Sequence, residues 1–248
     1  MNPSTELKAQ ILAHAREDMS RECCGLIINA GGKARYFPCK NVAPVAPELE
    51  LEQFVMDPRD YVEAKKAGDI LTIVHSHPMH PPRPSDADKV ECERSKLPWY
   101  IVNPRTAEDH YFEPSGYVQP ILGRQFVYGV FDCYTLIRDW YRQERDIELP
   151  YFESEFNWWK KPKGEPGWNM YRDNFASAGF VEISRDRVQE GDLLFMRHMT
   201  DRDNHAAIWL ADGRILHHAL NRLSCREVYD SYWRHMTTGA FHYVGPAE

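Results

Sequence analysis

The sequence predicts two α+β domains joined by a short linker. Its 248 residues are enough for two domains of about 100 to 150 residues each. Helical and strand patterns alternate in the first half, turn-forming residues gather at 113–123, and a new amphipathic helix starts at Asp132. We therefore expect one domain at 1–115 and a second at 116–248.

Three helices are predicted in the first half. Apolar residues recur at helical spacing over 7–19. A second helix is expected between Pro58 and Gly68, because proline favours the first turn of a helix and glycine its end. A third begins at Ser85 and must end before Pro98.

Strands are predicted between these helices. A short strand at 25–28 ends at a glycine pair, and the β-rich runs at 70–77 and 99–102 have the composition of buried strands. In the second half, the aromatic stretch 151–170 lacks periodicity and is expected to be a long ordered loop. From Gly191 onward the sequence has the pattern of strands and hairpins.

Composition restricts the classes of function. A content of 43% hydrophobic and 27% charged residues supports a packed core, and a net charge of −7 argues against a nucleic-acid partner. No apolar stretch approaches the roughly 20 residues that span a bilayer, and the N-terminus has no signal-peptide pattern. The six cysteines form no CxxC pair, so we expect reduced thiols and folding in a cytoplasm.

The most specific pattern is that of a metal site. His75 and His77 alternate on a predicted strand and therefore face the same side. Ser85 is a natural N-cap, which places Asp88 at the third position of the next helix. Two imidazoles and a carboxylate are the three protein ligands of a catalytic zinc, whose fourth position holds water. Glu22, just before a strand, is the candidate general base, and Ser85 is a candidate hydrogen-bond donor to the oxyanion.

These five residues resemble the complete signature of the JAMM (MPN-domain) metalloproteases, over about residues 5–115. The resemblance implies a cytidine-deaminase-like α/β sandwich and a zinc cofactor. It also implies a Glu22 general base and hydrolysis of peptide or isopeptide bonds.

A candidate nucleophile lies in the second half. Cys133 is predicted at a helix N-terminus with Asp132 as the cap, where unpaired amide groups favour a thiolate. The candidate base, His205, starts a strand of a predicted hairpin. A two-residue turn at 212–213 would bring His218 to the face of His205, whereas a three-residue loop at 211–213 would bring His217 there. The residues alone leave both registers open.

Asp132-Cys133, the segment 191–195, His205 and a histidine twelve residues later resemble the NlpC-type cysteine peptidases, over about 120–244. The resemblance implies a papain-like domain in which Cys133 and His205 are catalytic. It favours His217 over His218 as the third residue. Tyr134 departs from the small residue that many members carry after the cysteine, which puts substrate specificity in question.

A JAMM domain followed directly by an NlpC-type domain resembles the tail tip assembly proteins of lambda-like phages. The resemblance implies two peptidase sites, a zinc-dependent (iso)peptidase and a Cys-His endopeptidase that hydrolyses stem or cross-bridge peptides of peptidoglycan. Other phage tail tip proteins are the expected protein partners. The expected locations are the host cytoplasm during assembly and the virion tail tip. The alternative is a structural component whose peptidase folds serve as docking surfaces.

Overall fold

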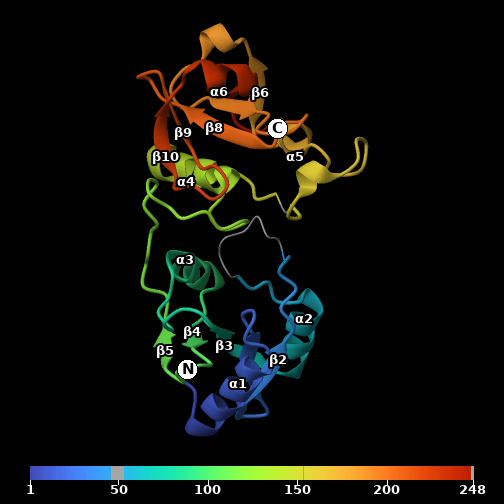
Figure 1. Ribbon diagram of the computed structural model, residues 1–248, viewed down its shortest axis with the longest axis vertical. Helices are drawn as coiled ribbons and strands as arrows, with labels where there is room; N and C mark the ends of the chain where they lie inside the picture. Colours follow the sequence, from blue (N-terminus) through green and yellow to red (C-terminus); the bar gives the residue numbers. More distant parts are fainter. Residues whose placement is uncertain (46–52, 153, 247–248) are drawn as a thin grey trace. The chain divides into compact units, whose positions relative to one another are not determined.

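The computed structural model describes residues 1–45, 53–152 and 154–246. The chain divides into two compact units, Met1–Gln119 and Pro120–Glu248 (Figure 1). Both combine helices with one β-sheet, and the predicted α+β class is confirmed. No helix among the described residues has the length and apolar character needed to cross a membrane.

The first unit is built on a five-stranded sheet with the order β2-β1-β3-β4-β5. Strands β3 and β4 are parallel and every other neighbouring pair is antiparallel. The strands are β1 (Cys24–Ala30), β2 (Lys33–Cys39), β3 (Asp69–Ser76), β4 (Trp99–Val102) and β5 (Asp109–Phe112). The two outer strands, β2 and β5, were not predicted from the sequence.

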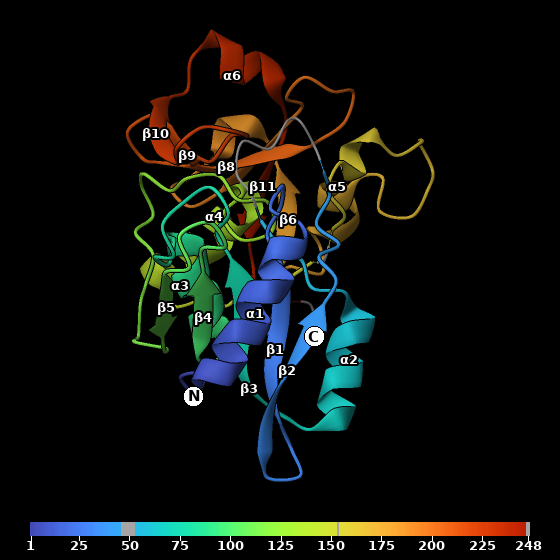
Figure 2. The same cartoon turned by 60° about the horizontal axis from the view of Figure 1, so that its bottom comes forward.

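Helices cover both faces of this sheet, as an α/β sandwich requires (Figure 2). Apolar residues of α1 (Thr5–Glu17) pack on one face against Ile27 and Val74. Ala64 of α2 (Pro58–Ala67) packs on the other face against Leu26. The third helix, α3 (Asp86–Ser95), begins at the predicted cap Ser85, so all three predicted helices are confirmed.

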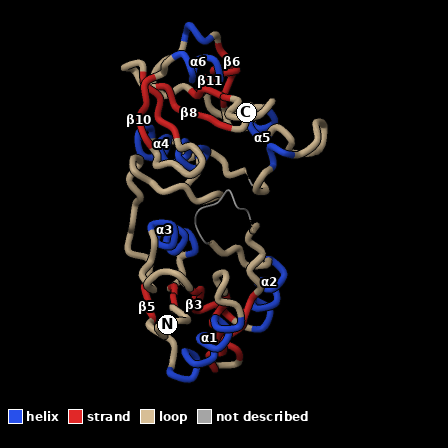
Figure 3. The backbone as a smooth tube through the Cα atoms, in the orientation of Figure 1, coloured by secondary structure: helices blue, strands red, loops and turns tan. Residues whose placement is uncertain are grey.

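The second unit has a six-stranded sheet with the order β10-β9-β8-β7-β11-β6. The strands are β6 (Phe180–Ile183), β7 (Leu193–Met196), β8 (His205–Trp209), β9 (Arg214–His217), β10 (Cys225–Val228) and β11 (Thr237–Tyr243). Helix α4 (Cys133–Arg145) packs on one face through Leu136 and Trp140. Helix α6 (Ser231–Met236) covers the other through Trp233 (Figure 3).

The hairpin between β8 and β9 adopts the three-residue loop. The Leu210 N–H donates to the Arg214 carbonyl at 2.9 Å, and Gly213 has a φ of +74°. His217 is therefore opposite Ala207 and diagonal to His205. The two-residue register, which would have paired Leu210 with Ile215, is wrong.

The described residues of the aromatic segment, 151–152 and 154–170, pack onto their own unit. Its short elements are the 3-10 turn η1 (Trp158–Lys160) and the start of α5 (Met170–Asn174). Trp158 is buried in the core. Arg202 holds the segment by donating to the carbonyls of Lys161 and Trp168 at 2.6 and 3.3 Å. A second 3-10 turn, η2 (Arg185–Arg187), lies outside this segment.

Candidate active sites

The first unit brings two imidazoles and a carboxylate together at the end of β3. His75 Nε2 lies 3.0 Å from His77 Nε2 and 3.2 Å from Asp88 Oδ1. His77 Nε2 lies 3.5 Å from Asp88 Oδ2. All three side chains are buried. Local geometry explains the convergence, because His75 lies in β3, His77 directly follows the last residue of that strand, and the capping box of α3 fixes Asp88.

These donor atoms fit a tetrahedral zinc ion. Ligand atoms about 2.0–2.1 Å from a tetrahedral centre lie about 3.3 Å from one another. The His75–His77 and His75–Asp88 Oδ1 separations are close to this value, and the His77–Asp88 separation is close to it for the other carboxylate oxygen, Oδ2. The Nδ1 atom of His77 lies 3.1 Å from the Pro81 carbonyl. A proton on Nδ1 would donate to that carbonyl and leave the Nε2 lone pair facing His75, as in metal-bound histidines.

Electrostatics favour a charged carboxylate in this site. Burial would raise the pKa of Asp88, but the charge of His75 and hydrogen bonds from His75 and His77 outweigh it and lower this pKa well below its usual range. Burial lowers the pKa of His75. His77 loses some proton affinity by burial, yet its bond to Asp88 and the charge of Glu22 raise its pKa overall. An ionised Asp88 is the protonation state that a carboxylate needs in order to bind a metal ion.

Glu22 and Ser85 lie beside the predicted ligands in different ways. Glu22 is buried, and its Oε1 atom is 3.8 Å from His77 Nε2. Glu22, His75 and His77 together offer three ligand atoms within 4.8 Å of one another. The Ser85 hydroxyl donates to Asp88 Oδ2 at 2.7 Å. Because a hydroxyl has one hydrogen, Ser85 in this arrangement orients Asp88 and has no hydrogen for an oxyanion.

The second unit places Cys133 at the first turn of α4. Asp132 is the N-cap and accepts from the backbone N–H groups of Tyr134 and Thr135, as predicted. The Cys133 Sγ atom lies 3.0 Å from the Tyr171 hydroxyl, a contact from α5 that the sequence did not predict.

His205 is the first of three hydrogen-bonded side chains. Its Nε2 atom lies 3.1 Å from His217 Nδ1, and His217 Nε2 lies 2.9 Å from Glu227 Oε2. Both histidines are buried. His218 points to another partner, with Nε2 3.1 Å from the Arg222 carbonyl. The structure thus brings His217, not His218, to His205 and adds Glu227, which no local motif marked.

Cys133 and His205 line one cavity of about 280 Å³. Tyr134, which departs from the pattern of related enzymes, lies in its wall. So does Trp159 of the segment 151–170, whereas Trp158 belongs to both the wall and the core. Further aromatic side chains complete the wall, namely Phe126, Tyr128, Tyr151, Phe152 and Tyr171. The cavity therefore presents extended apolar surface around a thiol and an imidazole.

Burial determines the protonation of this pair. It raises the pKa of Cys133 to about 12, and the Asp132 carboxylate adds to the rise, although the Tyr171 hydroxyl opposes it. Burial also lowers the pKa of His205 well below its usual range, with His217 contributing. The resting pair is therefore a neutral thiol and a neutral imidazole, and the thiolate expected from the helix N-terminus is outweighed by desolvation.

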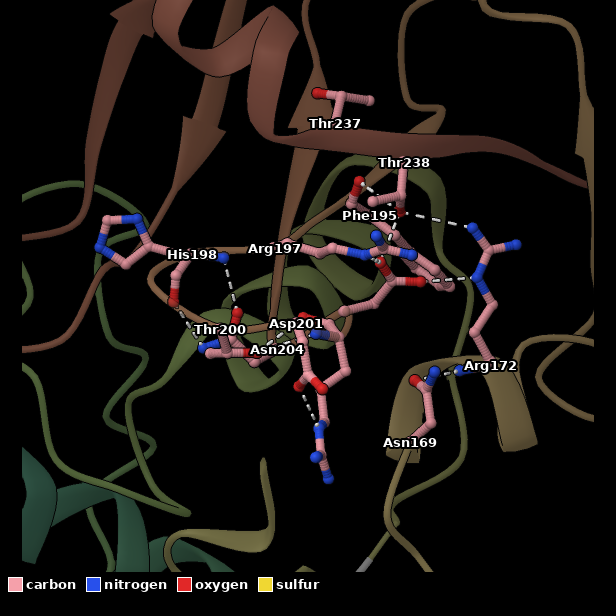
Figure 4. Close-up of polar contacts among 12 residues, drawn as sticks. Asn169, Arg172, Phe195, Arg197, His198, Thr200, Asp201, Asn204, Thr237 and Thr238 are labelled. Carbon is pink, nitrogen blue, oxygen red and sulfur yellow. Dashed lines mark hydrogen bonds and ion pairs between the residues drawn. The ribbon is translucent and has the colours of Figure 1, made fainter. Parts of the chain in front are cut away.

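A polar network holds the loop that precedes β8. The buried Asp203 carboxylate accepts from two side chains that Figure 4 labels, Arg172 through its Nε at 2.6 Å and Thr238 through its hydroxyl at 2.5 Å. In the same loop, the Asn204 side chain bridges the backbone of His198. His198 and Asn204 both line the cavity, so this network fixes its rim.

These two units define a class of protein in which a JAB-like unit is followed by an NlpC/P60 unit. Prokaryotic homologs of the JAB domain match residues 4–113, and the NlpC/P60 family matches residues 123–242. Tail tip assembly protein K of Escherichia phage N15 is 37% identical over 233 residues, covering 94% of this chain and 92% of that protein. The chain belongs to the tail tip assembly protein K family, which confirms the resemblance drawn from the sequence.

Two further proteins are similar to this chain. Tail tip assembly protein K of Escherichia phage lambda is 39% identical over 182 residues, covering 73% of this chain and 86% of that protein. The solution structure of protein DSY2949 from Desulfitobacterium hafniense is 29% identical, with a TM-score of 0.35, and covers 44% of this chain and 78% of that one.

Proposed function

We propose that this member of the family is a peptidase with two sites. The second unit would hydrolyse stem or cross-bridge peptides of peptidoglycan at Cys133 and His205. The first unit would be a zinc-dependent peptidase or isopeptidase. The observation that carries the proposal is the hydrogen-bonded series from His205 through His217 to Glu227, which ends at the cavity that holds Cys133.

The cysteine reaction follows from the neutral resting pair. As Cys133 Sγ bonds to the carbonyl carbon of the substrate, its proton passes to His205 Nδ1, the ring nitrogen that His217 does not contact. The amide C–N bond then breaks, and His205 returns the proton to the leaving nitrogen. His205 next takes a proton from a water molecule, whose oxygen displaces the thioester and restores the Cys133 thiol.

Neighbouring groups support these steps. The backbone N–H of Cys133 lies in the first turn of α4, where amide hydrogens have no partner within the helix, and it would donate to the oxyanion. The series His205, His217 and Glu227 would hold the His205 ring in one orientation and tautomer.

The zinc site would divide its tasks among five residues. His75, His77 and Asp88 would hold the ion, and Ser85 would orient Asp88. A bound zinc supplies Lewis acidity and a water of lowered pKa. The Glu22 carboxylate, buried beside His77, would accept the proton of the attacking water and pass it to the leaving nitrogen.

The relatives are named for tail tip assembly, and we propose the same setting for this chain. It would work with other phage tail tip proteins in the host cytoplasm and remain at the virion tail tip. The zinc site would process such a protein or act on the same wall peptides. A structural component that uses its peptidase folds for docking is the alternative, because the relatives' names describe assembly.

A paired assay on purified muropeptides tests the proposal. Cys133→Ala should abolish the products of the cysteine site, whereas Glu22→Gln should leave those products unchanged and remove only the products of the zinc site. If wild-type protein cleaves nothing, the docking alternative gains support. If it cleaves but neither substitution changes the products, both site assignments are wrong.

A further inference from the structure

A second group of side chains that could hold a metal ion includes His217, the hydrogen-bond partner of His205. His217 Nε2 is 2.9 Å from Glu227 Oε2 and 3.6 Å from Cys225 Sγ. The three ligand atoms all lie within 4.8 Å of one another. Sheet register produces this arrangement: Cys225 is directly opposite His217, and Glu227 is two residues further along β10 on the same face.

We propose that His217, Cys225 and Glu227 form an inhibitory zinc site of the second unit. A thiolate, an imidazole and a carboxylate are all ligands that zinc accepts, and the thiolate favours zinc over magnesium or calcium. Cys225 is a free, partly exposed thiol, and the Glu227 side chain is 37% exposed, so an ion can reach the site from solvent. Arg222 Nη1 lies 3.9 Å from Glu227 Oε2, but its side chain is 58% exposed and can swing away at little cost.

The inhibitory effect follows from the tautomers of the two histidines, and it rests on the proposed role of His205 as the base. To accept the Cys133 proton, His205 Nδ1 must be unprotonated, so His205 Nε2 carries the hydrogen and donates to His217 Nδ1. His217 then carries its own hydrogen on Nε2 and donates to Glu227. Each ring is neutral, and each hydrogen points away from Cys133.

Coordination at His217 Nε2 reverses this order. The ion takes the Nε2 lone pair, so His217 must carry its hydrogen on Nδ1 and donate to His205 Nε2. His205 must then carry its hydrogen on Nδ1, the position that the Cys133 proton would need. No proton is gained or lost by the two rings: each hydrogen moves to the other nitrogen, and the Cys225 thiol proton is released to solvent.

Cobalt(II) distinguishes this site from the one in the first unit, because only this one contains sulfur. Full-length protein titrated with cobalt should show the near-ultraviolet absorption of a cobalt-bound thiolate. Cys225→Ser should abolish the band, whereas Cys133→Ser should keep it. No band in wild type, or a band lost in Cys133→Ser and kept in Cys225→Ser, would overturn the site. None of these results depends on peptidase activity, so the metal site can be confirmed or rejected independently of the proposed function.

The effect on His205 is measured separately, by the ¹⁵N chemical shifts of its two ring nitrogens, which distinguish the two neutral tautomers. Zinc should move the His205 hydrogen from Nε2 to Nδ1 in wild type and leave it on Nε2 in Cys225→Ser. An unchanged tautomer with zinc in wild type would overturn the inhibition, and the same change in Cys225→Ser would show that zinc acts from another site.

Discussion

The Nε2 atom of His205 lies 3.1 Å from Nδ1 of His217, and both rings are buried. Because this contact occupies Nε2, the Nδ1 atom of His205 is the ring nitrogen that remains available to a group in the cavity. It exists because the β8–β9 hairpin has three loop residues, which set His217 diagonal to His205. Glu227, on the neighbouring strand β10, hydrogen-bonds to His217 in turn. Side chains from three adjacent strands therefore orient the ring of His205, the proposed base.

Replacement of His217 by alanine should lower kcat for muropeptide cleavage about 100-fold, because His205 loses the partner that fixes its tautomer. His217→Asn, which can still accept a hydrogen bond from His205, should retain more activity than the alanine variant. KM should change little in both, since His217 does not line the cavity. Equal kcat values for the asparagine and alanine variants would contradict a positioning role.

The reactivity of Cys133 should rise with pH without a plateau below about pH 10. Burial holds the pKa of this thiol at about 12, so below that value the thiolate fraction grows about tenfold for each pH unit. The rate of modification by iodoacetamide, measured for the Cys133 peptide between pH 6 and pH 10, checks this. Urea-unfolded protein is the reference and should level off near the ordinary cysteine pKa of about 8.5. A plateau at or below pH 7 in the folded protein would instead indicate a thiolate–imidazolium pair.

His77→Ala should remove about one equivalent of zinc, because it deletes one of three ligands. The comparison is best made in a Cys225→Ser background, so that zinc bound in the second unit does not contribute. His80→Ala is the matched control: His80 belongs to the same loop, is exposed, and should not affect the zinc content. Undiminished zinc in His77→Ala protein would rule out the ligand set.

Asp203→Ala should destabilise the second unit by about 2–3 kcal/mol, since it removes the buried carboxylate that accepts hydrogen bonds from Arg172 Nε and the Thr238 hydroxyl. Six of the seven tryptophans belong to this unit, all but Trp99, so their fluorescence during urea unfolding reports mainly on it. Asp201→Ala removes a carboxylate from the same loop whose side chain is 81% exposed, and it should change stability little. Similar losses for the two variants would contradict the structural role of Asp203.

For a physical reason, the sequence identified the neighbours in the candidate metal site more completely than those in the candidate cysteine site. His75 lies in β3 and His77 directly follows its last residue, and Ser85 and Asp88 form one capping box, so local spacing fixes most of the geometry. Glu22 is the exception, yet its position before β1 placed it beside β3.

Features that depend on contacts between distant parts of the chain could not be predicted from the sequence. The hairpin register depended on the left-handed backbone of Gly213, which both loop lengths could accommodate. Glu227 and Tyr171 come from elements with no sequence motif, and they reach the site only through the β9–β10 pairing and the packing of α5. The raised pKa of Cys133 is likewise a consequence of burial by the tertiary fold, which helix position alone did not reveal.

The initial rate of peptide-bond cleavage in purified muropeptides, compared between wild type and Cys133→Ala, tests the central claim most directly. Liquid chromatography with mass spectrometry would quantify the new fragments and identify the bond. We predict that wild type cleaves a stem or cross-bridge peptide and that Cys133→Ala is at least about 10³-fold slower. Equal rates for the two proteins would contradict the assignment of Cys133 as the nucleophile.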